Sequence, residues 1–200
     1  QRFQEYHNQV DIPEADVIIV LGGDGFMLDV LNEYHDSRIP FYGINRGTVG
    51  FLMNQTIGDN LIDQINLAEE TVIHPLKMEA TRQDGNSETG FAINEVSILR
   101  SGSQAAKLKI SVDSLVRMRE LVCDGALVST PAGSTAYNYS AHGPILPLGS
   151  NILALTAMAA FRPRRWRGAL IPSVAKIEID ILESEKRPVS AFADGKEVSK

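Results

Sequence analysis

The fold of the first part of the chain is decided by residues 15–35, which read ADVIIVLGGDGFMLDVLNEYH. Residues 15–21 are almost all apolar, as is typical of a parallel strand that is covered on both faces. The Gly22-Gly23-Asp24-Gly25 turn ends this strand. From Phe26 to His35 apolar side chains recur every three or four residues, which predicts an amphipathic helix that begins directly at the turn.

The same alternation continues beyond the first helix. Ile39 to Ile44 predict a second short strand, and residues 59–69 predict a second helix with Asp59 as its N-cap. Strands that alternate with helices are typical of a parallel sheet. The first third of the chain is therefore predicted to be α/β, a Rossmann-like domain with a parallel sheet.

Period-two alternation dominates the remainder of the chain. Residues 107–112 and 176–181 alternate apolar and polar side chains, and turn residues such as Asp113-Ser114 separate the short strands. No long linker, repeat or low-complexity tract interrupts the sequence. These patterns predict an α/β domain at residues 1–71, followed by a mainly β domain at residues 72–200.

Composition narrows the class of protein. With 44% hydrophobic and 22% charged residues, the 200-residue chain has enough apolar surface for a packed core, which excludes a disordered chain. The net charge of −6 argues against binding a long polyanion through overall charge. The single cysteine, Cys123, excludes an internal disulfide and is expected to be a strand thiol, and the four histidines lack metal-site spacing. No transmembrane run or signal segment is evident, so we expect a soluble, cytoplasmic protein.

The glycine turn at residues 22–25 is the first candidate site. Gly22, Gly23 and Gly25 let the backbone approach a ligand, and the helix that follows points free amides and its positive dipole end at an anion. The alternative is a tight turn in which Asp24 caps the helix. Neither GxGxxG nor a glycine-lysine-hydroxyl P-loop is present, which disfavours a hydride-transferring Rossmann enzyme and a Walker-type ATPase. The pattern that remains is a phosphate loop with a carboxylate that could deprotonate a hydroxyl or hold a divalent metal.

A second polar cluster flanks a predicted strand at residues 126–129. It consists of Asp124-Gly125 before the strand and of residues 130–137, with Ser140, after it, where a proline and glycine turn leads into a predicted short helix at residues 134–141. Its amides and hydroxyls could bind a sugar or phosphate, with Tyr137 as a flat face for a base. The alternative is ordinary helix capping with a core tyrosine.

Taken together, the motifs resemble those of bacterial NAD kinases, in order and in spacing. They are Gly22-Gly23-Asp24-Gly25, the loop segment from Gly43 to Leu52, Asn94-Glu95, and Thr130 to Tyr137 with Ser140. The glycine turn alone is shared with phosphofructokinases and lipid kinases of the diacylglycerol type. The Thr130 to Tyr137 segment is what selects the NAD kinase family.

The resemblance implies transfer of the terminal phosphoryl group of ATP or polyphosphate to the 2′-hydroxyl of the adenosine ribose of NAD, which gives NADP. It implies that Asp24 is the catalytic carboxylate, that Gly22, Gly23 and Gly25 bind the donor's phosphates, and that Mg²⁺ or another divalent metal accompanies the donor. It also implies a homodimer or homotetramer, with no nucleic acid or membrane partner. The implied NAD-binding residues are Phe51, Leu52, Asn94, Glu95, Asp124, Thr135, Ala136, Tyr137, Ser140 and Asp194.

The sequence also departs from the family pattern. Phe26 stands where many family members have threonine, and we expect the α/β domain to lack the family's first strand and helix. The alternative function is therefore a dinucleotide-binding module that has lost turnover. The arginine-rich run at residues 162–167 is open to two interpretations, a phosphate contact or a solvated or subunit-interface loop.

Overall fold

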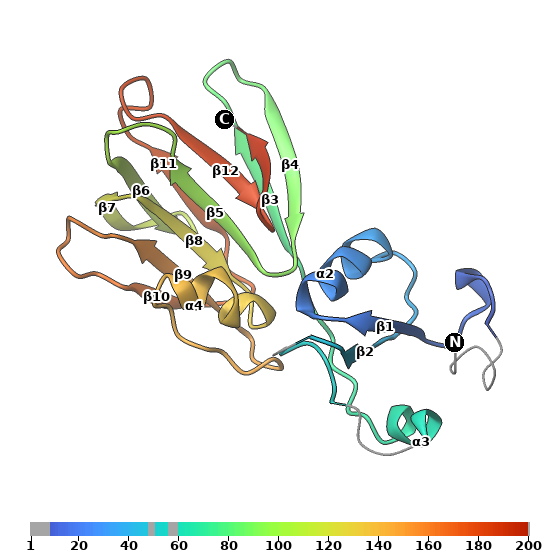
Figure 1. The fold of residues 1–200 in the computed structure, drawn as a ribbon. Coiled ribbons are helices and arrows are strands. Elements are labelled where there is room, and N and C mark those ends of the chain that lie inside the picture. Colours follow the sequence, from blue (N-terminus) through green and yellow to red (C-terminus); the bar gives the residue numbers. More distant parts are fainter. Residues whose placement is uncertain (1–8, 48–50, 56–59, 200) are drawn as a thin grey trace. The chain divides into compact units, whose positions relative to one another are not determined.

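The chain forms two compact units in a computed structural model, which describes residues 9–47, 51–55 and 60–199 (Figure 1). They divide between Glu70 and Thr71, one residue before the predicted boundary. We call them the α/β unit and the β unit. The order of an α/β unit followed by a mainly β unit confirms the predicted fold class. In the described residues, no helix is long and apolar enough to span a lipid bilayer.

The α/β unit is built on two parallel strands. Strand β1 lies beside β2 with Val20 opposite Gly43, and an isolated parallel bridge joins Ile44 to Asn54 on the far side of β2. The parallel pairing confirms the predicted α/β pattern. The elements of this unit are η1 (Ile12–Glu14), β1 (Ile18–Gly22), α2 (Asp24–Glu33), β2 (Phe41–Asn45) and α3 (Leu61–Asn66).

The two faces of this small sheet are covered unequally. On one face Val20 packs against Met27 of α2 and against Met53. On the other face α3 covers the β2 residues Tyr42 and Ile44 with Leu61. On that second face of β1, however, Ile19 is 36% exposed and Leu21 is 44% exposed. The prediction that β1 is covered on both faces is therefore wrong for the described residues, because the short helix α3 packs over β2.

The second helix is shorter than predicted. The sequence pattern predicts a helix at residues 59–69, but α3 spans Leu61–Asn66. Its N-cap is Asn60, whose side-chain oxygen accepts hydrogen bonds from the amides of Ile62 and Asp63. Asp59, the predicted N-cap, lies outside the described residues. The predicted cap is one residue too early, because aspartate and asparagine are both favoured N-cap residues and the pattern does not distinguish between them.

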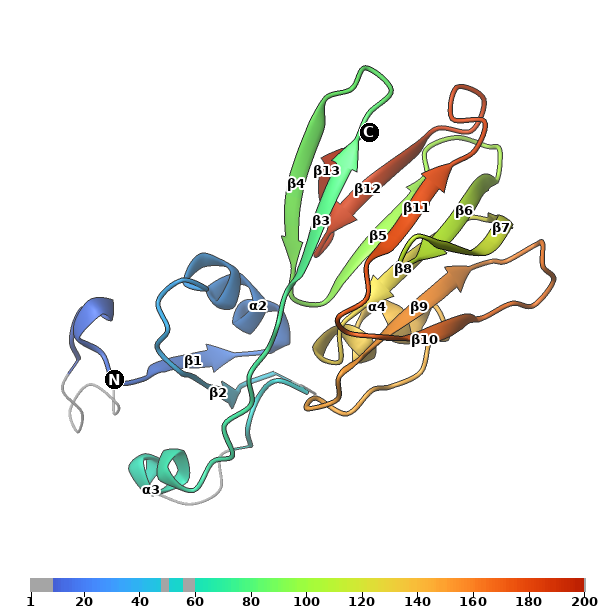
Figure 2. The same ribbon diagram turned by 180° about the vertical axis from the view of Figure 1, so that it is seen from behind.

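The β unit is a stack of antiparallel sheets (Figures 1 and 2). The largest sheet has six strands in the order β10-β9-β8-β5-β12-β13, a second has the order β11-β6-β7, and β3 pairs with β4 in a hairpin. Within this unit β8 lies at the centre of the six-stranded sheet, between β5 and β9. The strands are β3 (Leu76–Thr81), β4 (Ser87–Ala92), β5 (Glu95–Arg100), β6 (Ala106–Val112), β7 (Leu115–Cys123), β8 (Gly125–Ser129), β9 (Ile152–Met158), β10 (Gly168–Pro172), β11 (Ile177–Ile181), β12 (Val189–Ala193) and β13 (Lys196–Ser199).

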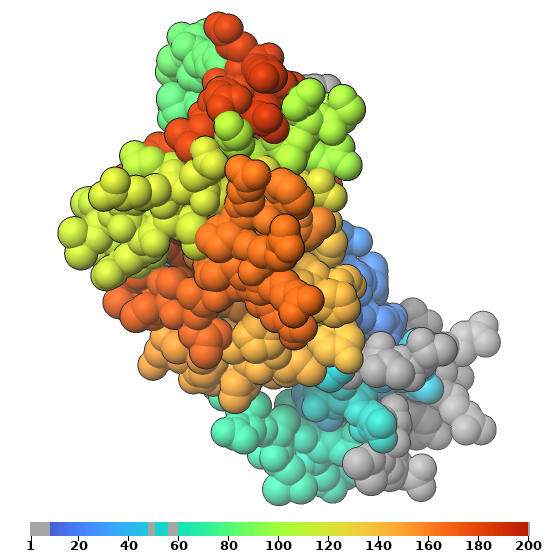
Figure 3. All heavy atoms as spheres, turned by 90° about the vertical axis from the view of Figure 1, so that its left-hand side faces the viewer, coloured from blue at the N-terminus to red at the C-terminus, as the bar shows by residue number. Residues whose placement is uncertain are grey.

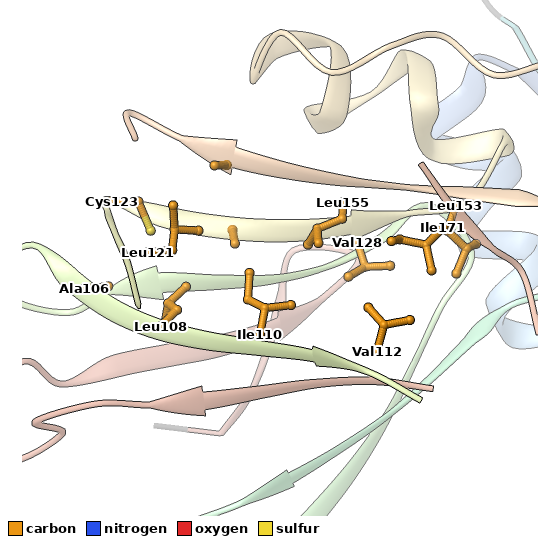
Figure 4. Close-up of a cluster of buried hydrophobic side chains, with 12 residues drawn as sticks. Ala106, Leu108, Ile110, Val112, Leu121, Cys123, Val128, Leu153, Leu155 and Ile171 are labelled. Carbon is orange, nitrogen blue, oxygen red and sulfur yellow. The ribbon is translucent and has the colours of Figure 1, made fainter. Parts of the chain in front are cut away.

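The main hydrophobic core lies between the six-stranded and three-stranded sheets. Leu108 and Ile110 of β6 face Val128 and Leu155 of the larger sheet across this layer (Figure 4). The alternating strands predicted at residues 107–112 and 176–181 are confirmed as the neighbours β6 and β11. Cys123 is a buried strand thiol, as predicted, and burial raises its pKa to about 11. This core holds the central strands β5 and β8 in place, and the second polar cluster lies at their ends.

Candidate functional site

The glycine turn joins β1 directly to α2. Gly23 is the N-cap residue in extended conformation, and Asp24 is the first residue of the helix. Asp24 does not cap α2, because its carboxylate binds elsewhere. A Cβ added at Gly23 or Gly25 would meet none of the described residues within 4 Å. Open space therefore lies in front of the turn, next to the first amides of a ten-residue helix, which have no acceptor within the helix.

The Asp24 carboxylate holds the loop that follows β2. One carboxylate oxygen accepts a hydrogen bond from the Phe51 amide at 2.7 Å, and the other accepts one from the Leu52 amide at 3.1 Å. The Arg46 amide donates to the Gly22 carbonyl oxygen at 2.8 Å, so the same loop is also tied to the end of β1. Phe51 and Leu52, which were predicted to line the ligand pocket, lie beside Asp24. Gly50, within the loop that carries the resemblance, lies outside the described residues.

In the β unit the candidate site is built on residues 93–95, between β4 and β5. The Asp194 carboxylate accepts hydrogen bonds from three successive amides, those of Ile93 at 2.8 Å, Asn94 at 2.8 Å and Glu95 at 3.2 Å. The Asp194 amide donates in return to the Glu95 carbonyl oxygen at 3.1 Å. The predicted residues Asn94, Glu95 and Asp194 are therefore brought together, although about 100 residues of sequence separate Asp194 from the other two.

The turn after β8 binds the opposite, carbonyl side of the same segment. The Thr130 hydroxyl donates to the Ile93 carbonyl oxygen at 2.6 Å, and the Thr130 amide donates to the Asn94 carbonyl oxygen at 2.9 Å. Gly133 packs so closely that an added Cβ would lie 2.1 Å from the Asn94 carbonyl oxygen. Only glycine fits this approach, which explains why the segment with the motif needs glycine here.

Glu95 is the most strongly perturbed carboxyl group of this cluster. The residue is 8% exposed, and its Oε2 atom has no hydrogen-bond partner among the described residues. Burial, and after it repulsion by Asp194, raises the pKa of Glu95 from 4.5 to about 7, although a hydrogen bond from the Tyr137 backbone amide acts in the opposite direction. A buried carboxyl with a free oxygen can bind a ligand hydroxyl either as donor or as acceptor.

The segment after Thr130 is not the single helix that the sequence predicts at residues 134–141. A 3₁₀ turn, η2 (Ala132–Thr135), and one helical turn, α4 (Tyr137–Ser140), are separated by a break at Ala136, where ψ is −125°. The break arises because Ser134 and Asn138 are fully buried and bind distant groups. The Ser134 hydroxyl accepts from the Leu146 amide at 2.9 Å, and Asn138 accepts from the Thr156 hydroxyl at 2.6 Å.

This scaffold leaves the predicted ligand residues at the surface of the turn. Tyr137 is 39% exposed, Ser140 is exposed, and Thr135 and Ala136 are partly exposed. The Tyr137 backbone contacts Glu95, so the turn and the Asn94-Glu95 motif form one cluster. The alternative of a buried core tyrosine at position 137 is therefore wrong.

Asp124 is the one predicted ligand residue of the β unit that the fold places elsewhere. Strand β8 separates it from Thr130, and Glu95 pairs with Ser129 at one end of that strand while Leu99 pairs with Gly125 at the other. At about 3.3 Å per residue, six residues of strand place Asp124 roughly 20 Å from Thr130. At its own end Asp124 accepts a hydrogen bond from Arg100 Nε at 2.7 Å.

Sequence reasoning missed the supporting roles of Gly133, Ser134 and Asn138. The glycine in a proline-alanine-glycine turn was a usable signal for close backbone approach, whereas the partners of Ser134 and Asn138 are too far along the chain to be read from local pattern.

Among the described residues, no three histidine, cysteine or acidic side chains converge as a metal cage would require.

The chain is similar to known proteins along most of its length. A family model for the ATP-NAD kinase N-terminal domain matches residues 3–68, and one for the ATP-NAD kinase C-terminal domain matches residues 93–200. The NAD kinase of Cereibacter sphaeroides (strain ATCC 17025 / ATH 2.4.3) is 62% identical over 192 residues, which are 96% of this chain and 76% of that protein. The NAD kinase of Caulobacter vibrioides is 57% identical over 198 residues, 99% of this chain and 76% of that protein.

Solved structures show the same fold. An NAD kinase from Archaeoglobus fulgidus in complex with ATP has a TM-score of 0.72 and 27% identity, and the match covers 97% of this chain and 75% of that one. Yeast NADH kinase complexed with NADH has a TM-score of 0.74 and 24% identity, over 92% of this chain and 54% of that one. At that identity the yeast enzyme supports the fold alone.

Proposed function

The chain belongs to the NAD kinase family and is a phosphotransferase acting on NAD to give NADP, and we propose that Asp24 activates the accepting hydroxyl. The acceptor is the 2′-hydroxyl of the adenosine ribose of NAD, and the donor is ATP or polyphosphate. Phosphoryl transfer asks the protein mainly to position the reactants and to orient the nucleophile. The observation that carries the proposal is the Asp24 carboxylate, fixed by two amides beside an open glycine turn.

The geometry suits a general base. The Phe51 and Leu52 amides occupy one lone pair on each Asp24 oxygen and fix the plane of the carboxylate. Each oxygen keeps a second lone pair that can accept the proton of the 2′-hydroxyl as the phosphoryl group is transferred. The free amides at the start of α2, next to Gly23 and Gly25, then bind the phosphates of the donor.

We propose that residues of the β unit contact the nucleosides of NAD. Asn94 has both donor and acceptor atoms, which suits ribose hydroxyls, and Glu95 has a free carboxyl oxygen for a further hydroxyl. The exposed ring of Tyr137 offers a flat surface to a base. Thr135, Ala136 and Ser140 lie on the same turn and complete the set.

A divalent metal fits this site only as a companion of the donor. Asp24 is a single carboxylate whose oxygens already accept amide hydrogen bonds, and such a ligand suits Mg²⁺ that keeps its waters and is held mainly by phosphates. Asp24 would hold the ion together with those phosphates. When bound, Mg²⁺ neutralises charge on the transferring group. For a reaction that consumes NAD and ATP we propose a cytoplasmic location.

Asp24→Asn tests the assignment, with Asp29→Asn on the exposed part of the same helix as the matched control. We expect Asp24→Asn to lower the rate of NADP formation roughly 10²- to 10⁴-fold while NAD binding stays within a few-fold of the parent. Asp29→Asn is expected to behave as the parent does. Near-normal turnover in Asp24→Asn contradicts the proposal. Recovery of its rate at high Mg²⁺ concentration would instead assign Asp24 to metal binding.

We further propose that the β unit associates with a second copy of itself. Apolar side chains of the β7 and β9–β10 segments, Leu115, Val116, Phe161 and Leu170, are each between 48% and 58% exposed. These segments lie side by side on one face of the unit, in yellow-green and orange in Figure 3. Both β7 and β10 are edge strands of their sheets, and association is one way to cover such edges. Sedimentation is expected to show a species larger than 21.9 kDa, and a strictly monomeric active enzyme contradicts this.

Association would also explain the position of Asp124, which lies roughly 20 Å from Thr130 at the other end of β8. We propose that Asp124 of one copy contacts the NAD that is bound by another copy. Mixing Asp24→Asn with Asp124→Asn protein tests this. In a dimer, half of the randomly mixed pairs are hybrids with one intact site each, so about a quarter of the parent activity is expected to return. No gain on mixing would show that Asp124 acts within its own copy or not at all.

A further inference from the structure

The hydrogen bonds of the Asp194 carboxylate point to a role in holding the backbone, whereas the sequence predicts a direct contact with NAD. Its two carboxylate oxygens accept from the amides of Ile93, Asn94 and Glu95, at 2.8, 2.8 and 3.2 Å. Charge-assisted bonds of this kind are roughly twice as strong as neutral ones. The carboxylate therefore works as a clamp on the backbone that carries two proposed ligand side chains.

The clamp is aimed by a strained turn. Asp194 and Gly195 connect β12 to β13 with φ values of +46° and +74°, the arrangement of a two-residue hairpin turn with both φ values positive. In this turn the Asp194 amide also donates to the Glu95 carbonyl oxygen at 3.1 Å. Main chain and side chain of one residue thus hold the same segment.

The opposite side of the segment is held just as firmly. Thr130 binds the carbonyl oxygens of Ile93 and Asn94, and Gly133 lies against the Asn94 backbone. With amides fixed by Asp194 and carbonyls fixed by Thr130, residues 93–95 have little freedom to rotate. The Asn94 and Glu95 side chains are therefore presented in one orientation before any ligand arrives, which reduces the ordering needed on binding.

The position of Asp194 is unfavourable for Glu95 itself. Asp194 is the second cause, after burial, of the raised pKa of the neighbouring Glu95 carboxyl. A second carboxylate near a buried one repels its charged form. A hairpin turn does not require its aspartate to bind residues 93–95. We therefore attribute these hydrogen bonds to the fixing of residues 93–95.

We propose that Asp194 is a positioning residue, which fixes Asn94 and Glu95 in the orientation that binds NAD and does so through their backbone amides. This inference rests on the proposed function and replaces a direct NAD contact by Asp194. An asparagine at this position keeps one acceptor oxygen but turns an NH₂ group toward the amides. The segment then loses part of its clamp, while Asn94 and Glu95 remain present.

The chain offers a matched control in Asp113. It also begins a two-residue hairpin turn with positive φ, Asp113 at +50° and Ser114 at +64°, and its carboxylate also accepts from a backbone amide, that of Lys176 at 2.9 Å. Its carboxylate binds next to the start of β11, and no hydrogen bond joins it to residues 93–95 in the described part of the structure. Asp113→Asn therefore measures the structural effect of the same substitution in the same kind of turn.

The experiment compares Asp194→Asn and Asp113→Asn in full-length protein by calorimetric NAD titration, by KM and kcat, and by the pH dependence of NAD binding. For Asp194→Asn we expect NAD affinity to fall roughly 10- to 100-fold, as for loss of hydrogen bonds to a charged group, with a smaller change in kcat. The Glu95 titration should move to lower pH, because one negative neighbour is removed. Asp113→Asn should show neither change.

Equal behaviour of the two variants, or an unchanged pH midpoint in folded Asp194→Asn, overturns the inference. If circular dichroism shows Asp194→Asn to be unfolded, Asp194→Glu decides, since it keeps the charge: reduced NAD affinity with an unshifted pH midpoint supports the clamp, and parental affinity overturns it. A parent protein that binds NAD without forming NADP removes the proposed catalytic role of Asp24 and leaves this binding comparison intact.

Discussion

Gly133→Ala tests whether the turn after β8 must lie directly against the Asn94 backbone. The added Cβ would come within 2.1 Å of the Asn94 carbonyl oxygen and 2.4 Å of its carbonyl carbon and Cα, well inside ordinary contact at 3.4–4 Å. Both partners are backbone, so neither can give way as the end of a flexible side chain can. Overpacking of this kind costs about 1–3 kcal/mol of unfolding free energy. A shift of about 1 Å in a binding site lowers activity by roughly 100-fold.

Trp166 makes this effect measurable in the right part of the molecule. It is the single tryptophan of the chain and lies in the β unit, so its fluorescence in a urea titration follows the unit that contains Gly133. The control is Gly149→Ala, where an added Cβ meets no atom of the described part of the chain within 4 Å, and we expect its unfolding free energy to stay within about 0.5 kcal/mol of the parent. Calorimetry gives the NAD affinity. Equal urea midpoints for the two variants, together with parental NAD affinity in Gly133→Ala, refute the reasoning.

Two further predictions concern the same segment. Asn94→Ala should weaken NAD binding roughly 5- to 150-fold and change ATP affinity little, as calorimetric titrations with each nucleotide would show; a selective loss of ATP binding contradicts the assignment. Burial and then Asp194 raise the pKa of Glu95 from 4.5 to about 7, so the folded state binds this proton more tightly and its unfolding free energy falls as pH rises through that window. Glu95→Gln should flatten the fall in urea midpoint between pH 4.5 and 7, and an unchanged slope contradicts the burial of this carboxyl.

Local pattern accounts for much of the fold and for part of the site. The glycine turn and α2 were predictable because the apolar run, the glycines and the helical spacing occupy one continuous stretch. Strands β6 and β11 were predictable because period-two alternation is also local. In both cases the residues whose pattern predicts the helix or strand are the residues that form it.

The rest depends on contacts between distant residues. The break at Ala136 arises because Ser134 binds Leu146 and Asn138 binds Thr156, 12 and 18 residues away. The exposed β1 residues follow from the packing of α3 over β2 rather than over β1. The clamp on residues 93–95 joins groups about 100 residues apart. In each of these contacts the two partners lie outside any one helix or strand, so the pattern of a single element does not reveal them.

The distance along the chain between Asp194 and the segment it holds also bears on how the protein is made. Residues 93–95 leave the ribosome long before Asp194 does, and closing a loop of this length carries an entropic cost that local contacts do not. The amides of Ile93, Asn94 and Glu95 therefore wait for the β12–β13 hairpin, and a nascent chain released before that hairpin would carry the motif in unclamped form. On the proposed function, affinity for NAD is in this sense acquired only after the β12–β13 hairpin has been made.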